Sequence, residues 1–296
     1  MLFNSSKINS GITCVIITNR KISEIKSLEA VLEITDKVII VTNRQENTSI
    51  SNNIRIIYST SQNYAYLRNL GAYYAETTHI LVIDSDEILD DTFIQEVKEI
   101  SYEAKIYCVN IKAFVGVKEV SMAQRYNPRI YNNREFVYIG RIHETLAGKR
   151  DDCIKLKGSI FNFSLEDWKG WYEKAKRYTS QERIEGRLIL RSIYPLFNFF
   201  KMEGWRDGLV GMKWTLKAFQ YVTMVFLYGK RGYVALKPEE IEQLILTDTV
   251  SKEEREYISA ILSKYFRSPR EQHSSKKDII SLDMLEQISS PFVRYY

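Results

Sequence analysis

The chain is poor in the residues that build small cross-linked or low-complexity proteins. Its 296 residues include only 13 glycines, five prolines and three cysteines. Cys14, Cys108 and Cys153 are odd in number, far apart, and without the short spacing of a zinc site. They therefore predict no disulfide framework and indicate a protein of a reducing compartment.

Long apolar runs are also absent from the sequence. No stretch reaches the roughly 18 uninterrupted apolar residues that a membrane-spanning helix needs. Leu188–Phe200 is interrupted by Arg191 and Pro195, and Ala218–Tyr228 is too short. The first 11 residues have no apolar core of signal-peptide length. These absences predict a cytoplasmic protein rather than a secreted or membrane-spanning one.

Charge is distributed unevenly along the chain. The whole sequence has a net charge of +5, with 45% hydrophobic and 27% charged residues, which is typical of a soluble globular protein. Residues 169–237 contain 14 Lys and Arg but only five Asp and Glu, interleaved with aromatic residues. This basic region indicates an anionic partner. Its apolar stretches predict helices on the inner face of the cell membrane, or alternatively a buried helix pair that completes the core.

Continuous apolar runs alternate with helical patterns in the first part of the chain. Strands are expected at 12–18, 37–42, 54–58 and 79–83. Helices are expected from Ser23 onward and over 64–76. This order, with strands that are continuous rather than alternating in polarity, is typical of a parallel sheet covered by helices. Later segments predict a helix over 91–102, strands at 105–114, 135–139 and 158–163, and helices from Glu166.

The run HILVIDSDE, residues 79–87, combines a buried strand with carboxylates. Asp84 and Asp86 follow the strand at once, and Glu87 is next to them. The carboxyl ends of strands are where open α/β sheets bind ligands. Two aspartates one residue apart can direct hard oxygen ligands at one Mg²⁺ or Mn²⁺. The alternative is a solvated acidic turn with a helix N-cap at Asp90 or Asp91.

Several other blocks flank this run in a fixed order along the chain. They are Thr18-Asn19-Arg20, Arg68-Asn69, Asp84-Ser85-Asp86-Glu87, Arg129-Ile130-Tyr131, Gly140-Arg141-Ile142-His143-Glu144, Tyr172 to Tyr178, and Lys201 to Gly211. In this order they resemble the family 2 glycosyltransferases of GT-A fold, over roughly residues 12–230. The resemblance is to the branch that holds bacterial lipopolysaccharide-core β-glucosyltransferases and bacteriocin S-glycosyltransferases.

The resemblance implies a fold and a domain organisation. The expected fold class is α/β, a Rossmann-like GT-A sheet that is mixed but mainly parallel and flanked by helices, followed by an α-helical C-terminal extension. Residues 1–165 would form the nucleotide-sugar and catalytic domain. Residues 166–237 would form a basic, aromatic helical segment facing the acceptor or the membrane, and 238–296 a short helical extension.

The resemblance also assigns roles to residues. Glu144 would be the catalytic base of an inverting transfer. A cation, Mn²⁺ or Mg²⁺, would be held by Asp86, with Asp84 as a further ligand or on the ribose or a metal-bound water. His143 would be a further metal ligand, a diphosphate donor or a spacer that orients Glu144. The donor would be bound by the residues Thr18, Asn19, Arg20, Thr42, Asn43, Arg68, Asn69, Asp84 and Ser85. Arg129 and Arg141 would bind phosphate or the acceptor, because a guanidinium fork suits phosphate oxygens. The alternatives are surface arginines and a His143-Glu144 pair in a surface salt bridge.

One departure from the family pattern concerns the second strand. The family commonly has an acidic residue after this strand that reads the nucleotide, whereas this chain has Val41-Thr42-Asn43-Arg44. Thr42 or Asn43 can still hydrogen-bond a uracil edge. The missing carboxylate leaves open a catalytically degenerate protein that binds sugar nucleotides.

The expected function is a metal-dependent, inverting transfer of a hexose from a nucleotide-sugar, expected to be UDP-linked, to a lipid-linked or lipopolysaccharide glycan. A peptide Cys, Ser or Thr acceptor is the nearest alternative. A nucleotidyltransferase is disfavoured because Thr18-Asn19-Arg20-Lys21-Ile22 has no glycine for a phosphate loop. No nucleic-acid partner is expected, and the C-terminal helices could pair two copies of the chain.

Overall fold

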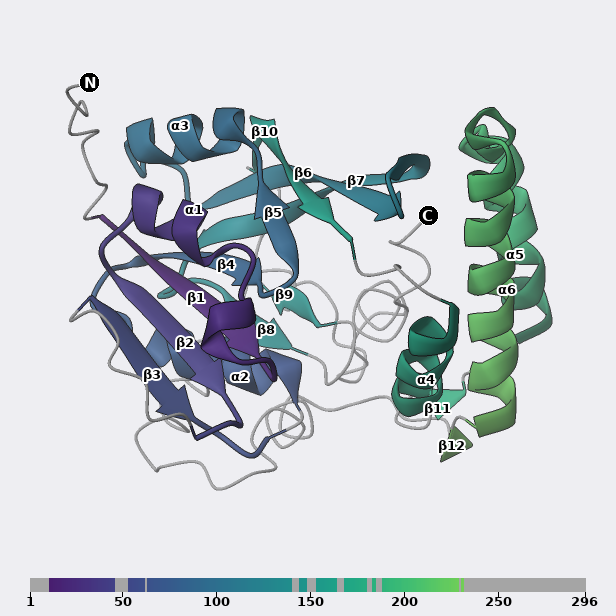
Figure 1. The fold of residues 1–296 in the computed structure, drawn as a ribbon, viewed down its shortest axis with the longest axis horizontal. Coiled ribbons are helices and arrows are strands. Elements are labelled where there is room, and N and C mark those ends of the chain that lie inside the picture. The colour runs from purple at the N-terminus through teal and green to yellow at the C-terminus, as the bar shows by residue number, and fades with distance from the viewer. Residues whose placement is uncertain are drawn as a thin grey trace, which may run out of the picture. The chain divides into compact units, whose positions relative to one another are not determined.

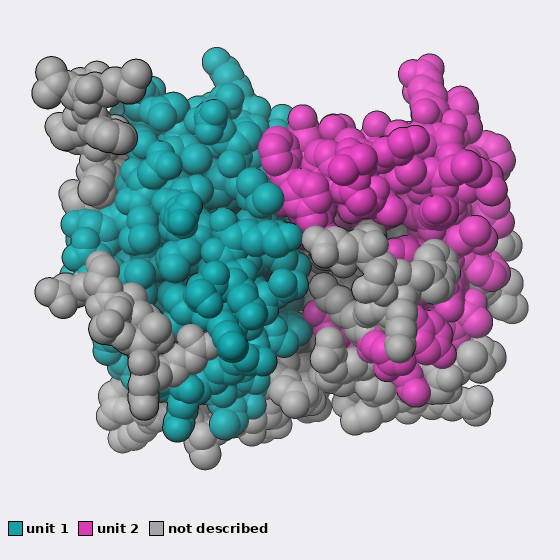
Figure 2. Space-filling model, in the orientation of Figure 1, with its two compact units in different colours: residues 1–110, 126–160, 236–279 teal, residues 111–125, 161–235, 280–296 magenta. Residues whose placement is uncertain are grey.

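We describe a computed structural model of the chain. The described residues are 11–45, 53–61, 63–139, 144–147, 153–163, 168–179, 183–184, 188–228 and 230–231. The chain divides into two compact units, which Figure 2 colours separately. One unit contains residues 1–110, 126–160 and 236–279, and we call it the catalytic unit after the catalytic domain that the sequence resemblance implies. The helical unit contains residues 111–125, 161–235 and 280–296. The helical unit therefore includes a segment, 111–125, that the sequence analysis had placed in the catalytic domain.

A mixed sheet forms the core of the catalytic unit (Figure 1). Its strand order is β3-β2-β1-β4-β7-β6-β10-β5. The first four strands run parallel to one another, and β7 is antiparallel to β4. Their bounds are β1 Ile12–Thr18, β2 Val38–Thr42, β3 Ile54–Tyr58, β4 His79–Asp84, β5 Glu87–Leu89, β6 Ile106–Val115, β7 Lys118–Asn132 and β10 Ile154–Asn162. The predicted fold class, a mixed sheet flanked by helices and followed by a helical part, is confirmed.

The central strands are buried along most of their length. Residues 12–16 of β1, all of β2 and residues 79–83 of β4 are buried. Continuous β-branched and aliphatic runs produce this pattern because helices cover the sheet and leave no polar face to water. The strand predictions at 12–18 and 54–58 are confirmed, and those at 37–42 and 79–83 are confirmed within one residue.

Helices pack against this sheet at places where their sequence permits close contact. The helices are α1 Leu28–Ile34, α2 Tyr64–Tyr73 and α3 Asp91–Glu99, and a short 3-10 helix, η1, covers Ile22–Glu24. Gly71 brings α2 close to β1, since a Cβ there would lie 2.4 Å from Val15. The Asn63 side chain caps α2 by accepting from Tyr66 N at 3.0 Å, and Asp90 caps α3 by accepting from Phe93 N at 2.7 Å.

The sequence analysis missed the longest strand. β7 follows β6 through a turn at Gly116 and Val117, in which Gly116 has a φ of +62° that favours glycine. Its polar and apolar residues do not alternate regularly, and Pro128 lies within it, so its sequence does not resemble a strand. The short strands β5 and β9 Thr145–Ala147 were missed as well. β8 Val137–Ile139 lies within the strand predicted at 135–139, and it pairs with β9.

The expectation that the cysteines form no disulfide was wrong. Cys108 in β6 and Cys153 directly before β10 form a disulfide, with Cα atoms 5.9 Å apart. The two residues are 45 positions apart in sequence, so only the neighbouring positions of β6 and β10 in the sheet bring them together. Cys14 is a buried free thiol, as its apolar run predicted.

The helical unit consists mainly of three helices. They are α4 Trp168–Thr179, α5 Leu188–Lys201 and α6 Leu209–Tyr228, with a 3-10 helix, η2, at Gly204–Asp207. Two short strands, β11 Arg183–Ile184 and β12 Lys230–Arg231, pair in parallel. Tyr221, Met224 and Val225 of α6 form a buried cluster with Ala175 of α4. Among the described helices, none is long and apolar enough to cross a bilayer. The helices expected after residue 238 lie outside the described residues.

Candidate functional site

The candidate site lies at the carboxyl ends of the parallel strands in the catalytic unit. The register pairs Thr18 at the end of β1 with Thr42 at the end of β2, and it pairs Ile17 with Asp84 at the end of β4. Three of the predicted site residues therefore lie along one edge of the sheet. Parallel strands place their carboxyl ends at the same edge, which is where open α/β sheets bind ligands.

The two threonines occupy equivalent positions in equivalent turns. Thr18 Oγ1 accepts from Arg20 N at 3.0 Å, and Thr42 Oγ1 accepts from Arg44 N at 3.2 Å. Each hydroxyl is used as an acceptor in its turn, so each keeps an O–H donor for another group. Asn19, Arg20 and Asn43, also predicted to bind the donor, are exposed beside these turns.

Two serines that sequence reasoning missed continue this edge after β3. Ser59 N donates to Thr42 O at 2.9 Å, which places the serine next to the second threonine. Ser59 Oγ then accepts from Ser61 N at 3.2 Å, and Ser61 Oγ accepts from Asn63 N at 3.0 Å. The stretch Tyr58-Ser59-Thr60-Ser61 directly after a predicted strand was the signal that could have identified them.

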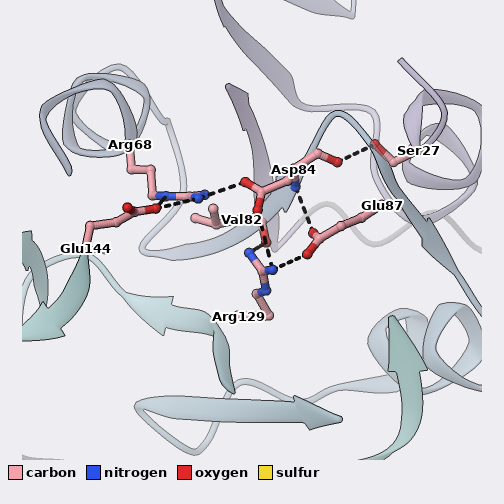
Figure 3. A network of polar contacts seen from close by, with 7 residues as sticks. All are labelled: Ser27, Arg68, Val82, Asp84, Glu87, Arg129 and Glu144. Carbon is pink, nitrogen blue, oxygen red and sulfur yellow. Dashed lines mark hydrogen bonds and ion pairs between the residues drawn. The ribbon is translucent and has the colours of Figure 1, made fainter. Parts of the chain in front are cut away.

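Arg68 joins two of the predicted motifs (Figure 3). Its Nη2 donates to Asp84 Oδ1 at 2.7 Å, and its Nε donates to Glu144 Oε1 at 2.8 Å. The Arg68 side chain is only 6% exposed, against 30% for Asp84 and 15% for Glu144. Burial tends to lower the pKa of Arg68, but Asp84 and Glu144 outweigh it and hold that pKa well above its usual value. One buried guanidinium thus connects the metal motif with the candidate base.

A second buried arginine supports Asp84 from another direction (Figure 3). Arg129 Nη2 contacts Glu87 Oε1 and lies 3.7 Å from Asp84 Oδ2. Glu87 Oε2 accepts from Asp84 N at 2.9 Å. Burial raises the pKa of Glu87 to about 7, whereas Arg129 acts to lower it. Glu87 and Arg129 together hold both the backbone and the side chain of Asp84.

The position of Arg129 bears on its predicted role. The sequence analysis assigned it to phosphate or acceptor binding, with a surface arginine as the alternative. The structure excludes the surface alternative, because Arg129 is 8% exposed in β7 and its guanidinium is engaged by Glu87. Its Nη2 contacts Glu87 and Asp84, and its predicted contact with phosphate or the acceptor stays a prediction.

Asn69, predicted to bind the donor, is used in backbone contacts. Its Nδ2 donates to Tyr138 O at 2.8 Å, and its Oδ1 accepts from Tyr138 N at 2.9 Å. The residue is 2% exposed. Asn69 therefore connects α2 to β8, the strand that precedes Glu144, and it helps to place Glu144 beside Arg68.

The described residues supply a limited set of ligands for a divalent cation. In the part of the chain that the structure describes, no group of three His, Cys, Asp or Glu side chains comes together as a metal site. Asp84 is engaged by the arginines, whereas Asp86 is partly exposed and accepts no hydrogen bond from the described residues. Ser85, between them, is 9% exposed. Mg²⁺ commonly takes one or two carboxylates and completes its shell with water and phosphate oxygens, so this set fits a cation shared with a diphosphate.

Two predicted residues cannot be placed. Arg141, the second predicted phosphate ligand, and His143, the third predicted metal ligand, lie outside the described residues. Both belong to the segment directly before Glu144, which is described. Their assigned roles stay predictions.

Comparisons with known proteins gave neighbours only among solved structures. No family model and no curated protein matches the chain. One similar structure is GalNAc-T7 with UDP, GalNAc and Mn²⁺, at a TM-score of 0.37 and 9% identity, over 58% of this chain and 47% of that one. S. aureus TarS 1-349 is similar at a TM-score of 0.37 and 12% identity, over 92% and 95%. A second structure of S. aureus TarS gives a TM-score of 0.35 and 13% identity, over 57% and 39%. The chain thus spans less than half of the GalNAc-T7 chain, and its function is inferred from its own site.

Proposed function

We propose that the chain is an inverting glycosyltransferase that moves a hexose from a nucleotide-sugar, UDP-linked, to a lipid-linked or cell-surface glycan. One observation carries the proposal. Arg68 and Glu144 are 76 residues apart in sequence, and Asp84 lies between them. The Arg68 side chain nevertheless contacts both carboxylates, at 2.7–2.8 Å. Each of these residues belongs to a different motif that the sequence resemblance associates with sugar transfer.

The residues present can perform the transfer as follows. The acceptor oxygen attacks the anomeric carbon, and the bond from that carbon to the diphosphate oxygen breaks on the opposite face. The proton of the acceptor hydroxyl moves to Glu144. Both Arg68 contacts use Glu144 Oε1. Within the described residues Oε2 has no partner and is available for this proton.

Charge on the departing nucleoside diphosphate must be neutralised as it forms. A bound Mn²⁺ or Mg²⁺ would supply this, held by Asp86 with Asp84 beside it. Arg68 contributes from the protein side, because its Nη1 is buried and has no hydrogen-bond partner among the described residues. That N–H can donate to an oxygen of the bound donor, while Nε and Nη2 keep Glu144 and Asp84 in place.

The test is release of UDP from a panel of UDP-sugars, measured with Mn²⁺, with Mg²⁺ and with EDTA. Glu144→Gln removes the base and keeps the shape, and we expect it to lower the rate by about 10²–10⁴-fold. Asp86→Asn should lower it as well and weaken the response to added metal. Glu135→Gln is the matched control, since Glu135 is a surface acid paired with Lys105. Full activity in Glu144→Gln or Asp86→Asn would contradict the proposal.

A further inference from the structure

An apolar stripe on α6 is open to solvent. Leu209, Met212, Leu216 and Phe219 recur at spacings of three and four residues, so they share one side of the helix. Their exposed fractions are 73%, 51%, 55% and 43%. We call these four residues the α6 stripe. Water contact with so many large apolar side chains is unfavourable, and such patches usually mark an interaction surface.

Aromatic side chains are exposed in the same unit, where α5 leads into η2. Phe197, Phe200 and Trp205 are 57%, 61% and 50% exposed. The rings of Phe200 and Trp205 lie 6.3 Å apart, and Lys201 Nζ lies 6.0 Å from the centre of the Phe197 ring. Aromatic rings with a lysine beside them are the groups that gather at the headgroup level of a bilayer.

The charge of these two helices has a single sign. The sequences of α5 and α6 contain Arg191, Lys201, Lys213 and Lys217 and no Asp or Glu. Lys213 is exposed and follows Met212 of the stripe. The same helices thus present apolar and positively charged groups and no negative one.

The acidic residues between α5 and α6 are already engaged. Glu203 pairs with Arg206 at 2.7 Å, and Asp207 Oδ2 accepts from Met122 N at 3.1 Å. Among the described residues, neither carboxylate forms an ion pair with Lys201 or Lys213. The ammonium groups of these two lysines can therefore contact an anionic partner.

We propose that the α6 stripe and the exposed aromatic residues Phe197, Phe200 and Trp205 bind the surface of a bilayer that contains anionic lipid. The apolar side chains would enter the boundary between headgroups and acyl chains, and Lys201 and Lys213 would contact lipid phosphates. A second copy of the chain fits less well, because lysine is depleted in the centres of protein interfaces and two such surfaces would repel each other. This binding needs neither donor nor acceptor, so it stands separately from sugar transfer.

The experiment is flotation of the full chain with vesicles, in the absence of nucleotide-sugar. One vesicle is phosphatidylcholine alone, and the other is an equimolar mixture of phosphatidylcholine and phosphatidylglycerol. We expect the protein to float with the mixed vesicles and to dissociate in high salt, because exposed charges are screened. Absence of the protein from the floating fraction would overturn the proposal.

Variants separate this surface from non-specific adsorption. Leu209→Ser combined with Leu216→Ser should reduce partition into mixed vesicles about a hundredfold, since each buried leucine contributes about tenfold. Lys201→Glu combined with Lys213→Glu should reduce it about tenfold or more. The matched control is Val117→Ser, because Val117 is 93% exposed but belongs to the β6–β7 turn. An unchanged partition in the leucine pair, or an equal loss in Val117→Ser, would refute the assignment.

The alternative to lipid binding is self-association of the chain. Sedimentation velocity on the wild-type protein and the same variants tests it. A wild-type dimer that the leucine pair converts to monomer, with no vesicle binding, would show that a second copy covers the stripe. The UDP-release assay in detergent-free buffer gives an independent measurement. Absence of vesicle binding by the wild-type protein, with its UDP release intact, would reject the surface proposal alone.

Discussion

The two units differ in the kind of energetically unfavourable side chain that each contains. The catalytic unit buries charge: Arg68, Glu87 and Arg129 are all under 9% exposed and are held in ion pairs. The helical unit exposes apolar surface: of the 14 large hydrophobic side chains exposed among the described residues, nine lie between Leu196 and Phe219. Buried charge is costly unless it is paired, and exposed apolar surface is costly unless it is covered. The buried charges pair with one another within the described residues. The exposed apolar side chains would be covered by the bilayer surface that we propose.

The largest effect is expected when one charge of the buried pair is removed. Arg129→Met leaves Glu87 buried without its counter-charge and should lower the free energy of unfolding by about 3–5 kcal/mol. The double variant Arg129→Met with Glu87→Leu should recover most of this loss, because no charge is then left unpaired. Urea unfolding of the wild-type protein, the single variant and the double variant measures these free energies of unfolding. Equal losses in the single and double variants would show that the ion pair itself is not the cause.

Two methionines of α6, one buried and one exposed, test whether the exposed apolar side chains of the helical unit contribute to binding rather than to stability. Met224 is 3% exposed and Met212 is 51% exposed. Met224→Ala should destabilise the protein by about 2–5 kcal/mol, because it removes core packing. Met212→Ala should change stability by no more than about 0.5 kcal/mol, yet weaken vesicle binding. Thermal unfolding and flotation of both variants provide the readouts, and a large loss of stability in Met212→Ala would place that residue in the core instead.

The two-directional hydrogen bonding of the Arg68 guanidinium should affect kcat more than its positive charge alone does. Arg68→Lys keeps one positive charge but cannot contact Asp84 and Glu144 from two fixed directions. Small displacements of catalytic groups cost about 100-fold in rate, and we expect a fall of that order in kcat for UDP release. Arg55→Lys is the control, since Arg55 lies exposed in β3 over the Tyr74 ring. A change in KM alone would assign Arg68 to binding.

The smallest effect concerns pH, and it arises at the opposite end of β4 from the site. Burial lowers the pKa of His79, although the Ala104 carbonyl and Glu135 act to raise it. The unfolded chain therefore binds a proton near pH 6.5, where the folded protein still holds a neutral imidazole. Stability should fall as pH drops below 6.5. In His79→Gln this part of the pH dependence should disappear, as measured by urea unfolding between pH 5 and 8. An identical pH profile in both proteins would rule out His79 as the source.

The elements that sequence analysis predicted are those with a strong local pattern. β1 to β4 are continuous apolar runs, and the helix after them has its N-cap at Asp90, one of the two positions considered. β7 was missed because its burial depends on its neighbours β4 and β6 rather than on its own pattern. The predicted helix from Ser23 forms only as η1 and the shorter α1.

The features of the candidate site also fall into those that local sequence determines and those that require the tertiary structure. Sequence alone determined that Asp84 and Asp86 follow a buried strand and that Arg68 and Glu144 belong to a shared order of motifs, because residue type and spacing are local properties. Only the tertiary structure decided that Arg68 bridges Asp84 and Glu144, that Arg129 pairs with Glu87, and that Cys108 meets Cys153. These contacts join residues 16 to 76 positions apart. The packing of α2 against the strands, together with strand order in the sheets, brings them together, and no local pattern encodes it.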